Sequence, residues 1–190
     1  YQRRVRGKTK PLCLITGNKN KLDEFTRMVD GKLDWVHANL DVPELQGSPE
    51  EVARQKCRCA AKLYGGPVII EDDSFCIAAL GGMPGVYIRY FWESVGPQGI
   101  TKMLSAFQDK SAYAQCIYAF CSPQTEVQLF VGRCYGKVVE SESKEFDAIF
   151  APDLGGGKTL AELPREEKNR ISHRELAAEK LIEFLKVFIK

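Results

Sequence analysis

The strongest constraint on the fold is a helix whose start and end can both be read from the sequence. SPEE at 48–51 combines an N-cap serine, a proline at the first helical position and a glutamate three residues after the cap, which is typical of a helix start. The glycine pair at 65–66 is typical of a helix end. Apolar runs at 12–16 and 67–70 precede and follow this helix, which predicts an α/β unit.

The rest of the pattern extends this unit into a mixed sheet. A helix is expected from about Leu22, and a weaker strand near 35–38. Two β-rich runs, 112–121 and 126–139, are joined by Ser-Pro-Gln-Thr, which predicts a hairpin and therefore antiparallel pairing. From Pro164 to the terminus, apolar residues recur at helical spacing. We therefore expect an α/β domain with a mixed sheet and two lobes.

Composition narrows the class of protein. A chain of 190 residues with 44% hydrophobic residues supports one core, and a net charge of +2 is too small to indicate nucleic-acid binding. No apolar run approaches the length of a membrane span. The first ten residues include five basic ones, so we expect a disordered basic arm at 1–10 and a single domain at 11–190. Seven cysteines without a CxxC pair favour a reduced, cytoplasmic protein.

The stretch TGNKNK, residues 16–21, connects the first apolar run to a helical pattern. Gly17 permits a close approach of the backbone, and Thr16, Asn18 and Lys21 can donate hydrogen bonds. A helix N-terminus at the end of a strand offers free N–H groups and a positive dipole end to an anion. A phosphate site is one interpretation of this corner, and a tight turn carrying solvated lysines is the other.

Three consecutive acids follow a buried strand, and Asp72 lies between Glu71 and Asp73. Clustered carboxylates repel one another unless a cation neutralises them, and Mg²⁺ prefers carboxylate, water and phosphate oxygens as ligands. Glu44, in a glycine-bounded loop, is a further candidate ligand. An acidic turn that caps a helix is the alternative interpretation.

A third group of polar residues lies near the C-terminus. Lys168 and Ser172 are four residues apart and share a helix face, and His173 and Arg174 follow. Arginine has only N–H donors, so Arg174 would accept a 6-oxo purine and reject the 6-amino group of adenine. A solvated basic patch is the alternative.

Six motifs occur together in a fixed order, and the chain resembles the inosine triphosphate pyrophosphatase family. The resemblance covers residues 12 to about 185. It implies an elongated mixed β-sheet flanked by helices with a central cleft between two lobes, and a homodimer. It also implies hydrolysis of ITP, dITP and XTP to the monophosphate and pyrophosphate with Mg²⁺, for which Mn²⁺ is a substitute. The motifs are TGNKNK (16–21), PELQG (43–47), EDDS (71–74), ALGGMPG (79–85), FDAIFAPD (146–153) and EKNRISHR (167–174).

The resemblance also implies a role for each candidate residue. Asp72, which activates water, and Lys21 are the implied catalytic residues. Glu44, Asp72 and Glu71 are the implied metal ligands. The implied substrate-binding residues are Thr16, Gly17, Asn18, Lys21, Lys56, Phe146, Asp147, Lys168, Ser172, His173 and Arg174.

The chain departs from the family pattern at two positions that bear on function. Asp73 stands where Ser or Thr is usual, and Lys144 stands where an outer aromatic residue is usual. An added charge at Asp73 bears on metal binding, and Lys144 leaves base stacking to Phe146. Two alternative functions therefore stay open: a nucleotide-binding protein without turnover, and a pyrophosphatase for other modified nucleotides.

Overall fold

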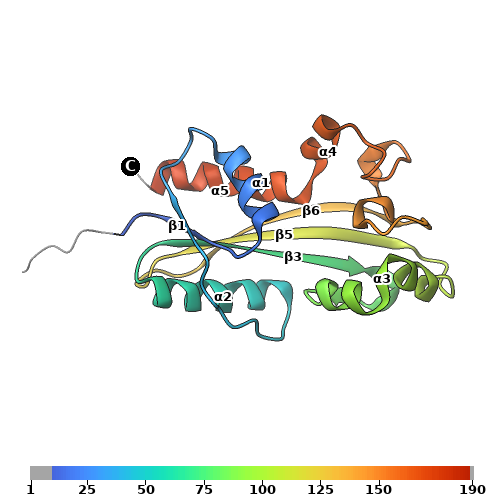
Figure 1. Cartoon of the computed structure of the whole chain (residues 1–190), viewed down its shortest axis with the longest axis horizontal. Coiled ribbons are helices and arrows are strands. Elements are labelled where there is room, and N and C mark those ends of the chain that lie inside the picture. Colours follow the sequence, from blue (N-terminus) through green and yellow to red (C-terminus); the bar gives the residue numbers. More distant parts are fainter. Residues whose placement is uncertain (1–9, 189–190) are drawn as a thin grey trace, which may run out of the picture.

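The computed structural model describes residues 10–188, so residues 1–9 of the predicted basic arm lie outside the described part. A seven-stranded mixed sheet runs the length of the molecule, in the order β2-β1-β3-β5-β6-β7, with β4 paired to β3. Figure 1 shows the elongated shape that the long strands produce. The strands are β1 (Cys13–Ile15), β2 (Val36–Ala38), β3 (Val68–Ile77), β4 (Pro84–Gly85), β5 (Ser111–Cys121), β6 (Gln128–Val138) and β7 (Phe150–Pro152).

The predicted mixture of parallel and antiparallel pairing is confirmed. Strand β1 pairs in parallel with both β2 and β3, while β3, β5, β6 and β7 pair antiparallel. The hairpin expected between 112–121 and 126–139 is the β5–β6 pair. The α-helices of the described residues are α1 (Lys19–Val29), α2 (Pro49–Tyr64), α3 (Ile88–Leu104), α4 (Arg165–Ile171) and α5 (His173–Phe188).

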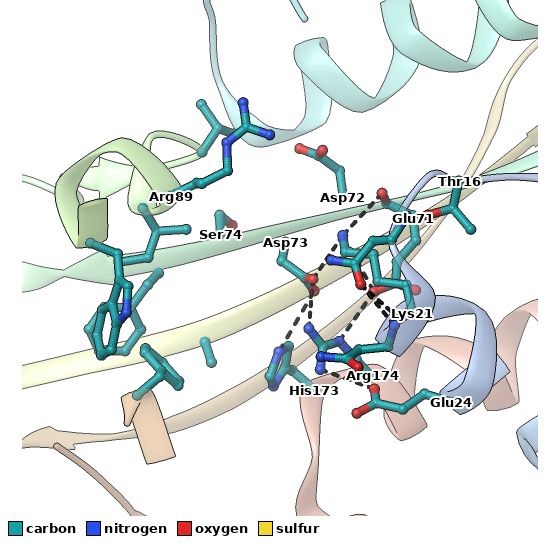
Figure 2. A pocket seen from close by; sticks show the side chains of 18 of the residues that line it. Thr16, Lys21, Glu24, Glu71, Asp72, Asp73, Ser74, Arg89, His173 and Arg174 are labelled. Atoms are coloured by element: carbon teal, nitrogen blue, oxygen red, sulfur yellow. Dashed lines mark hydrogen bonds and ion pairs between the residues drawn. The ribbon is translucent and has the colours of Figure 1, made fainter. Parts of the chain in front are cut away.

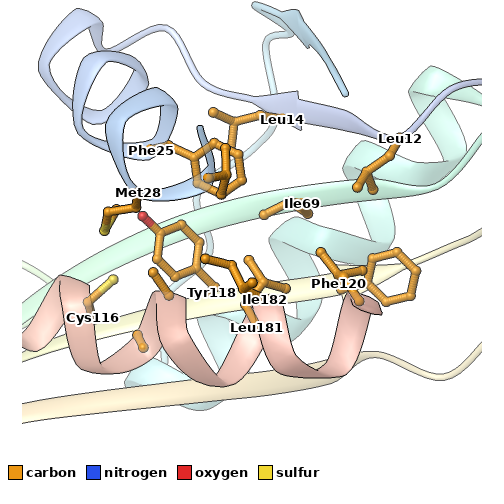
Figure 3. Close-up of a cluster of buried hydrophobic side chains, with 14 residues drawn as sticks. Leu12, Leu14, Phe25, Met28, Ile69, Cys116, Tyr118, Phe120, Leu181 and Ile182 are labelled. Carbon is orange, nitrogen blue, oxygen red and sulfur yellow. The ribbon is translucent and has the colours of Figure 1, made fainter. Parts of the chain in front are cut away.

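The helices cover both faces of the sheet (Figure 1). Helices α1 and α5 pack on one face around a core that contains Phe25, Ile69, Tyr118 and Leu181 (Figure 3). Helix α2 packs on the opposite face, over a second core that includes Ile70. A third core, which includes residues of α3 and of the far ends of β3, β5 and β6, closes the other end of the sheet. None of the helices of residues 10–188 is long and apolar enough to cross a membrane.

A gap along one edge of β3 separates the two ends of the sheet. Strand β1 pairs with residues 68–70 of β3, and β4 pairs with residues 75–76 on the same side of the strand. On its other side β3 pairs with β5 along its whole length. Residues 71–74 are therefore bordered by a strand on one side only within the described chain. Because successive side chains of a strand point to opposite faces, Asp72 points to one face of the sheet beside this gap, and Glu71 and Asp73 point to the other.

Three sequence-based expectations about the elements need correction. The first helix starts at Lys19 instead of Leu22, because the Asn18 side chain caps it. The acidic residues lie in the middle of β3 and not after its end, because β3 continues to Ile77 in pairing with β5. They still line an open edge, because β1 ends at Ile15. The single C-terminal helix is two helices, because Ser172 is extended (ψ 134°) and ends α4.

Candidate functional site

A cleft of about 1980 Å³ lies over the gap in β3. It is lined from the β1–α1 corner, the middle of β3, helices α2 and α3, the segment around Phe146 and the start of α5. Figure 2 shows that charged side chains meet here from both sides of β3. Every residue that the sequence analysis nominated lines this one cleft: Thr16, Gly17, Asn18, Lys21, Glu44, Lys56, Glu71, Asp72, Phe146, Asp147, Lys168, Ser172, His173 and Arg174.

The β1–α1 corner forms a helix N-terminus that faces the cleft. The Asn18 side chain accepts hydrogen bonds from the backbone N–H groups of Asn20 (2.9 Å) and Lys21 (3.3 Å), and the backbone N–H of Asn18 donates to Thr16 Oγ1 at 3.1 Å. A Cβ atom at position 17 would lie 2.8 Å from Asn39 Oδ1, so Gly17 allows the chain to pass this side chain. The corner is suited to an anion, because it lies at the positive dipole end of α1.

One wall of the cleft is organised around Lys56 of α2. Its Nζ atom lies 3.1 Å from Asp72 Oδ1 and 3.1 Å from Glu44 Oε1. Arg89 of α3 approaches the second oxygen of Glu44 at 3.5 Å. Burial raises the pKa of Asp72 even though Lys56 and Lys21 favour its ionised form. Burial would also raise the pKa of Glu44, but Lys56 and Arg89 outweigh it and lower that pKa.

The opposite wall holds two cations and three carboxylates in contact (Figure 2). Lys21 Nζ lies 2.9 Å from Asp73 Oδ2 and 3.6 Å from Glu71 Oε1. Arg174 donates to the same two carboxylates, at 2.9 Å to Asp73 and 3.2 Å to Glu71, and to Glu24 at 3.0 Å. The Tyr118 hydroxyl donates to Glu71 Oε2 at 3.0 Å. Three of the five N–H donors of Arg174 are thus directed at carboxylates, which fixes the guanidinium plane.

Burial and neighbouring charges act in opposite directions on this wall. Burial raises the pKa of Glu71 to about 7, against Lys21 and Arg174, which lower it. Burial would raise the pKa of Asp73 as well, but Lys21 and Arg174 outweigh it and hold that pKa well below its usual range. The surroundings therefore favour the ionised form of Asp73 and the protonated form of Glu71, each compared with an exposed carboxylate.

Helix α5 is brought to this wall by close contact with the sheet. A Cβ atom at position 132 of β6 would lie 2.0 Å from the carbonyl oxygen of His173, so only glycine lets the helix start approach so closely. Burial lowers the pKa of His173 to about 4, although Asp73 favours its protonated form. The imidazole is therefore neutral at physiological pH and lies against Asp73, with Nε2 3.8 Å from Oδ1.

The far end of the cleft is aromatic. The Phe146 ring packs edge-on against Phe75 with centroids 4.8 Å apart, and Trp92 of α3 lies against Phe146 at 6.0 Å. Lys168 of α4 forms an ion pair with Asp147. Planar apolar surface beside charged hydrogen-bonding groups suits a flat heterocycle with a polar edge.

The structure divides the predicted metal ligands between the two walls. Glu44 and Asp72 share Lys56, whereas the carboxylate of Glu71 is engaged by Lys21, Arg174 and Tyr118. Three potential ligands do come within 4.8 Å of one another among the described residues, namely Glu71, Asp73 and Cys116. Cations already contact both of these carboxylates, and burial raises the pKa of Cys116 well above its usual range, so this group is poorly suited to a metal ion. Glu71 as a metal ligand stays a prediction.

Sequence reasoning gave no role to several residues that line or support the cleft. Glu24 lies three residues after Lys21 on the same helix face, so helical spacing could have indicated it. Tyr118 reaches Glu71 through the β3–β5 register, and the sequence does not specify long-range pairing. Arg89 and Trp92 come from a helix in which no motif marks them.

Together these features define an open α/β sheet protein with a cleft that is lined by charged side chains at the β1–α1 corner and is aromatic at its far end. The chain belongs to the Ham1 family, whose model matches residues 12–184.

Relatives and solved structures agree with this assignment. The chain is 49% identical over 180 residues to "Inosine triphosphate pyrophosphatase" of Giardia intestinalis, covering 92% of each chain. It is 43% identical over 171 residues to the protein of that name from Fusarium vanettenii, covering 88% of this chain and 91% of the relative.

A HAM1 protein from Coxiella burnetii superposes with a TM-score of 0.81 at 27% identity, over 92% of this chain and 97% of that one. A dITP/XTP pyrophosphatase from Mycobacterium abscessus superposes with a TM-score of 0.70 at 28% identity, over 90% of this chain and 98% of that one.

Proposed function

We propose that the protein is a nucleoside triphosphate pyrophosphatase that hydrolyses the non-canonical purine nucleotides ITP, dITP and XTP to the monophosphate and pyrophosphate. The observation that carries the proposal is that Lys21, Asp72 and Arg174, from three separate elements, line a single cleft. The names of the Giardia and Fusarium relatives support the same activity. Removal of these nucleotides from the cellular pool is the role that follows.

The triphosphate is bound at the β1–α1 corner in this proposal. Thr16, Gly17 and Asn18 offer hydrogen-bond donors at the start of α1, and Lys21 adds a positive charge. Lys56 and Arg89 face them from the α2 and α3 side of the cleft. Phosphoryl transfer depends mainly on positioning and on placed positive charge, which this arrangement supplies from both walls.

The residues around Lys56 fit a divalent cation. The ammonium group of Lys56 already lies between the carboxylates of Asp72 and Glu44, 3.1 Å from an oxygen of each. The position between these oxygen donors therefore suits a cation. Carboxylates with room for water and phosphate oxygens are the ligand set of Mg²⁺. We propose that Asp72 and Glu44 hold Mg²⁺, or Mn²⁺ in its place, with Glu71 kept as a predicted third ligand. When bound, the ion supplies charge that polarises the phosphate oxygens.

Asp72 is the proposed general base. Its carboxylate lines the cleft and is largely shielded from solvent, so it can accept a proton from a water molecule bound there. Asp72 takes a proton from a water molecule, whose oxygen bonds to the α-phosphorus while the bond from this phosphorus to the α–β bridging oxygen breaks. The monophosphate keeps the water oxygen, and pyrophosphate leaves with the bridging oxygen. Lys21 and Lys56 stabilise the negative charge that develops on the leaving group.

The base is proposed to lie at the aromatic end of the cleft. Phe146, assisted by Trp92, provides the apolar surface, and Asp147 fixes Lys168 by an ion pair. Lys168, Ser172, His173 and Arg174 face the polar edge of the base. Their donors match the 6-oxo group of hypoxanthine or xanthine and leave the 6-amino group of adenine unpaired, which is the kind of mismatch that rejects a substrate strongly.

A substrate panel tests the activity. Purified protein with Mg²⁺ is given ITP, XTP, GTP, ATP or dUTP at equal concentration, and pyrophosphate release is measured. We expect ITP and XTP to be hydrolysed at least tenfold faster than ATP. Tight binding of ITP without pyrophosphate would instead favour a nucleotide-binding protein. A preference for dUTP would favour a pyrophosphatase for other modified nucleotides.

Assembly and location are further proposals. We propose a cytoplasmic homodimer that binds no nucleic acid. The seven cysteines form no disulfide in the described structure, which is consistent with the location, and a net charge of +2 supports the absence of nucleic-acid binding. The resemblance supports the dimer, which sedimentation at micromolar concentration tests. A monomeric species throughout that range would overturn it.

A further inference from the structure

Asp73 occupies a position that the proposed reaction does not require. Its side chain lies on the opposite face of β3 from Asp72, on the side of Lys21 and Arg174 (Figure 2). A single oxygen of its carboxylate, Oδ2, lies 2.9 Å from Lys21 Nζ and 2.9 Å from Arg174 Nη2. These are the cations proposed to contact the phosphates and the base. A protein carboxylate therefore fills the space between them, where an oxygen of an anionic ligand would otherwise make the same contacts.

The second oxygen of Asp73 is poorly satisfied. Oδ1 is buried and has no hydrogen-bond partner among the described residues, and the same holds for His173 Nδ1. The Nε2 atom of the neutral His173 imidazole lies 3.8 Å from Oδ1, beyond hydrogen-bond distance. Buried polar atoms without partners are rare in folded proteins and call for an explanation. The carboxylate is held in place by Lys21 and Arg174 through Oδ2, at the expense of its other oxygen.

Asp73 contributes to the net charge of the second wall. Lys21 and Arg174 contribute two positive charges, and the carboxylates in contact with them are Glu24, Glu71 and Asp73. The group has one net negative charge when all three carboxylates are ionised. Without Asp73 the same group would be neutral and would no longer repel a phosphate-bearing anion.

We propose that Asp73 is a specificity-determining residue, an internal counter-anion that excludes metal-free polyphosphates from Lys21 and Arg174. This inference rests on the proposed function, in which those two cations contact the substrate. Its chemistry is rejection by a placed like charge, one of the two routes to specificity. A triphosphate whose charge is partly neutralised by a divalent cation is admitted, whereas free triphosphate and free pyrophosphate are repelled. The same repulsion favours departure of the pyrophosphate product.

The test is the binding of inorganic pyrophosphate without metal. Calorimetric titration in EDTA compares the wild type with Asp73→Asn, which keeps the shape of the side chain, and with Asp73→Ser, which removes the carboxylate altogether. Glu24→Gln is the matched control, because it removes one negative charge from the same group, while Glu24 forms no ion pair with Lys21 in the described structure and its side chain is 41% exposed. We expect both Asp73 variants to bind pyrophosphate at least tenfold more tightly, and Glu24→Gln to change affinity less than threefold.

A second titration with Mg²⁺ sharpens the result. The ratio of the Kd without metal to the Kd with metal is expected to be at least tenfold lower in the Asp73 variants than in the wild type. Unchanged or weaker metal-free binding in both variants would overturn the proposal, because Asp73 would then position the two cations without competing for them. If Asp73→Asn does not fold, Asp73→Ser decides the matter by the same criterion.

The experiment distinguishes failure of this proposal from failure of the proposed function. Pyrophosphate binding is measured without turnover, so a chain that fails to hydrolyse ITP can still show the tenfold gain, and only the proposed function falls. Hydrolysis of ITP together with unchanged pyrophosphate binding leaves the function in place and removes the role of Asp73.

Discussion

The two walls of the cleft differ in how their charges are arranged. On the α2 side, Lys56 lies between Asp72 and Glu44, and the Glu44 side chain is 46% exposed. On the α1–α5 side, Lys21 and Arg174 are held against a Glu71 side chain that is only 1% exposed. The first wall is an open set of oxygen donors suited to exchange of a cation. The second is a fixed network whose positive charges are already paired. We propose that the first wall holds the metal ion and the general base, and that the second wall binds and selects the substrate and stabilises the leaving group through Lys21.

The largest expected effect belongs to the Lys56 wall. Asp72→Asn keeps the shape of the side chain but removes the proton acceptor, so turnover of ITP should fall at least about a thousandfold. Affinity for ITP, measured by calorimetry, should change less than about threefold. Near-normal rates of pyrophosphate release in this variant would remove Asp72 from the mechanism and end the functional division between the walls.

The second-largest expected effect is on the pH dependence of stability, through His173 on the second wall. His173 has a folded-state pKa of about 4, below its ordinary value of 6.5, so the unfolded chain takes up a proton between these values and the folded chain does not. Stability therefore falls as pH decreases through this window. Relative to His173→Gln, the wild type should lose about 2 to 3 kcal/mol of unfolding free energy between pH 7 and pH 4.

Urea unfolding of both proteins at several pH values measures this difference. Glu71 acts in the opposite direction, because its pKa is raised to about 7 and burying its ionised form becomes unfavourable as pH rises. Since Glu71 is present in both proteins, its contribution cancels in the comparison. Parallel stability curves would show that His173 is not buried as a neutral imidazole.

Selection of the base is the third expected effect. Arg174→Ala should lower kcat/KM for ITP about tenfold more than for ATP, because the lost donors pair only with a 6-oxo group. Arg170→Ala, which removes an exposed arginine of the neighbouring helix, is the control and should leave the ratio unchanged. Equal losses for the two nucleotides would mean that Arg174 contributes charge alone.

The smallest expected effect is the loss of stability when the hydrogen bond from Tyr118 to Glu71 of the second wall is removed. Tyr118→Phe removes the hydroxyl that donates to Glu71, leaving a buried carboxylate oxygen without its donor, and should cost about 1 to 2 kcal/mol of unfolding free energy. Tyr135→Phe is the control, because this tyrosine is 55% exposed, and should change stability by less than about 0.5 kcal/mol. Similar thermal denaturation for both variants would argue against a stabilising network.

Local signals in the sequence predicted much of the fold. The capping box at Ser48 and Glu51 is present, because caps depend on residues that are close in sequence. The break at Ser172 was missed, since both flanking segments have helical patterns and the extended conformation of Ser172 depends on how α5 packs against the sheet. That packing involves Gly132, about forty residues away in the chain, and a long-range contact of this kind leaves no local signature.

The candidate site divides in the same way. Motifs nominated residues on both walls, and all of them line the cleft. Alternation along an extended chain indicates that Glu71, Asp72 and Asp73 cannot all converge without a turn, but the sequence suggested that β3 ended before them and did not assign them to separate walls. It also could not assign partners to Asp73, whose contacts with Lys21 and Arg174 join three elements that are distant in sequence.

The most direct test of the proposed reaction follows the oxygen of the attacking water. ITP is hydrolysed with Mg²⁺ in ¹⁸O-enriched water, and the products are analysed by mass spectrometry. If water attacks the α-phosphorus, the inosine monophosphate carries one labelled oxygen and the pyrophosphate carries none. Label in the pyrophosphate, or release of orthophosphate as the first product, would contradict the account.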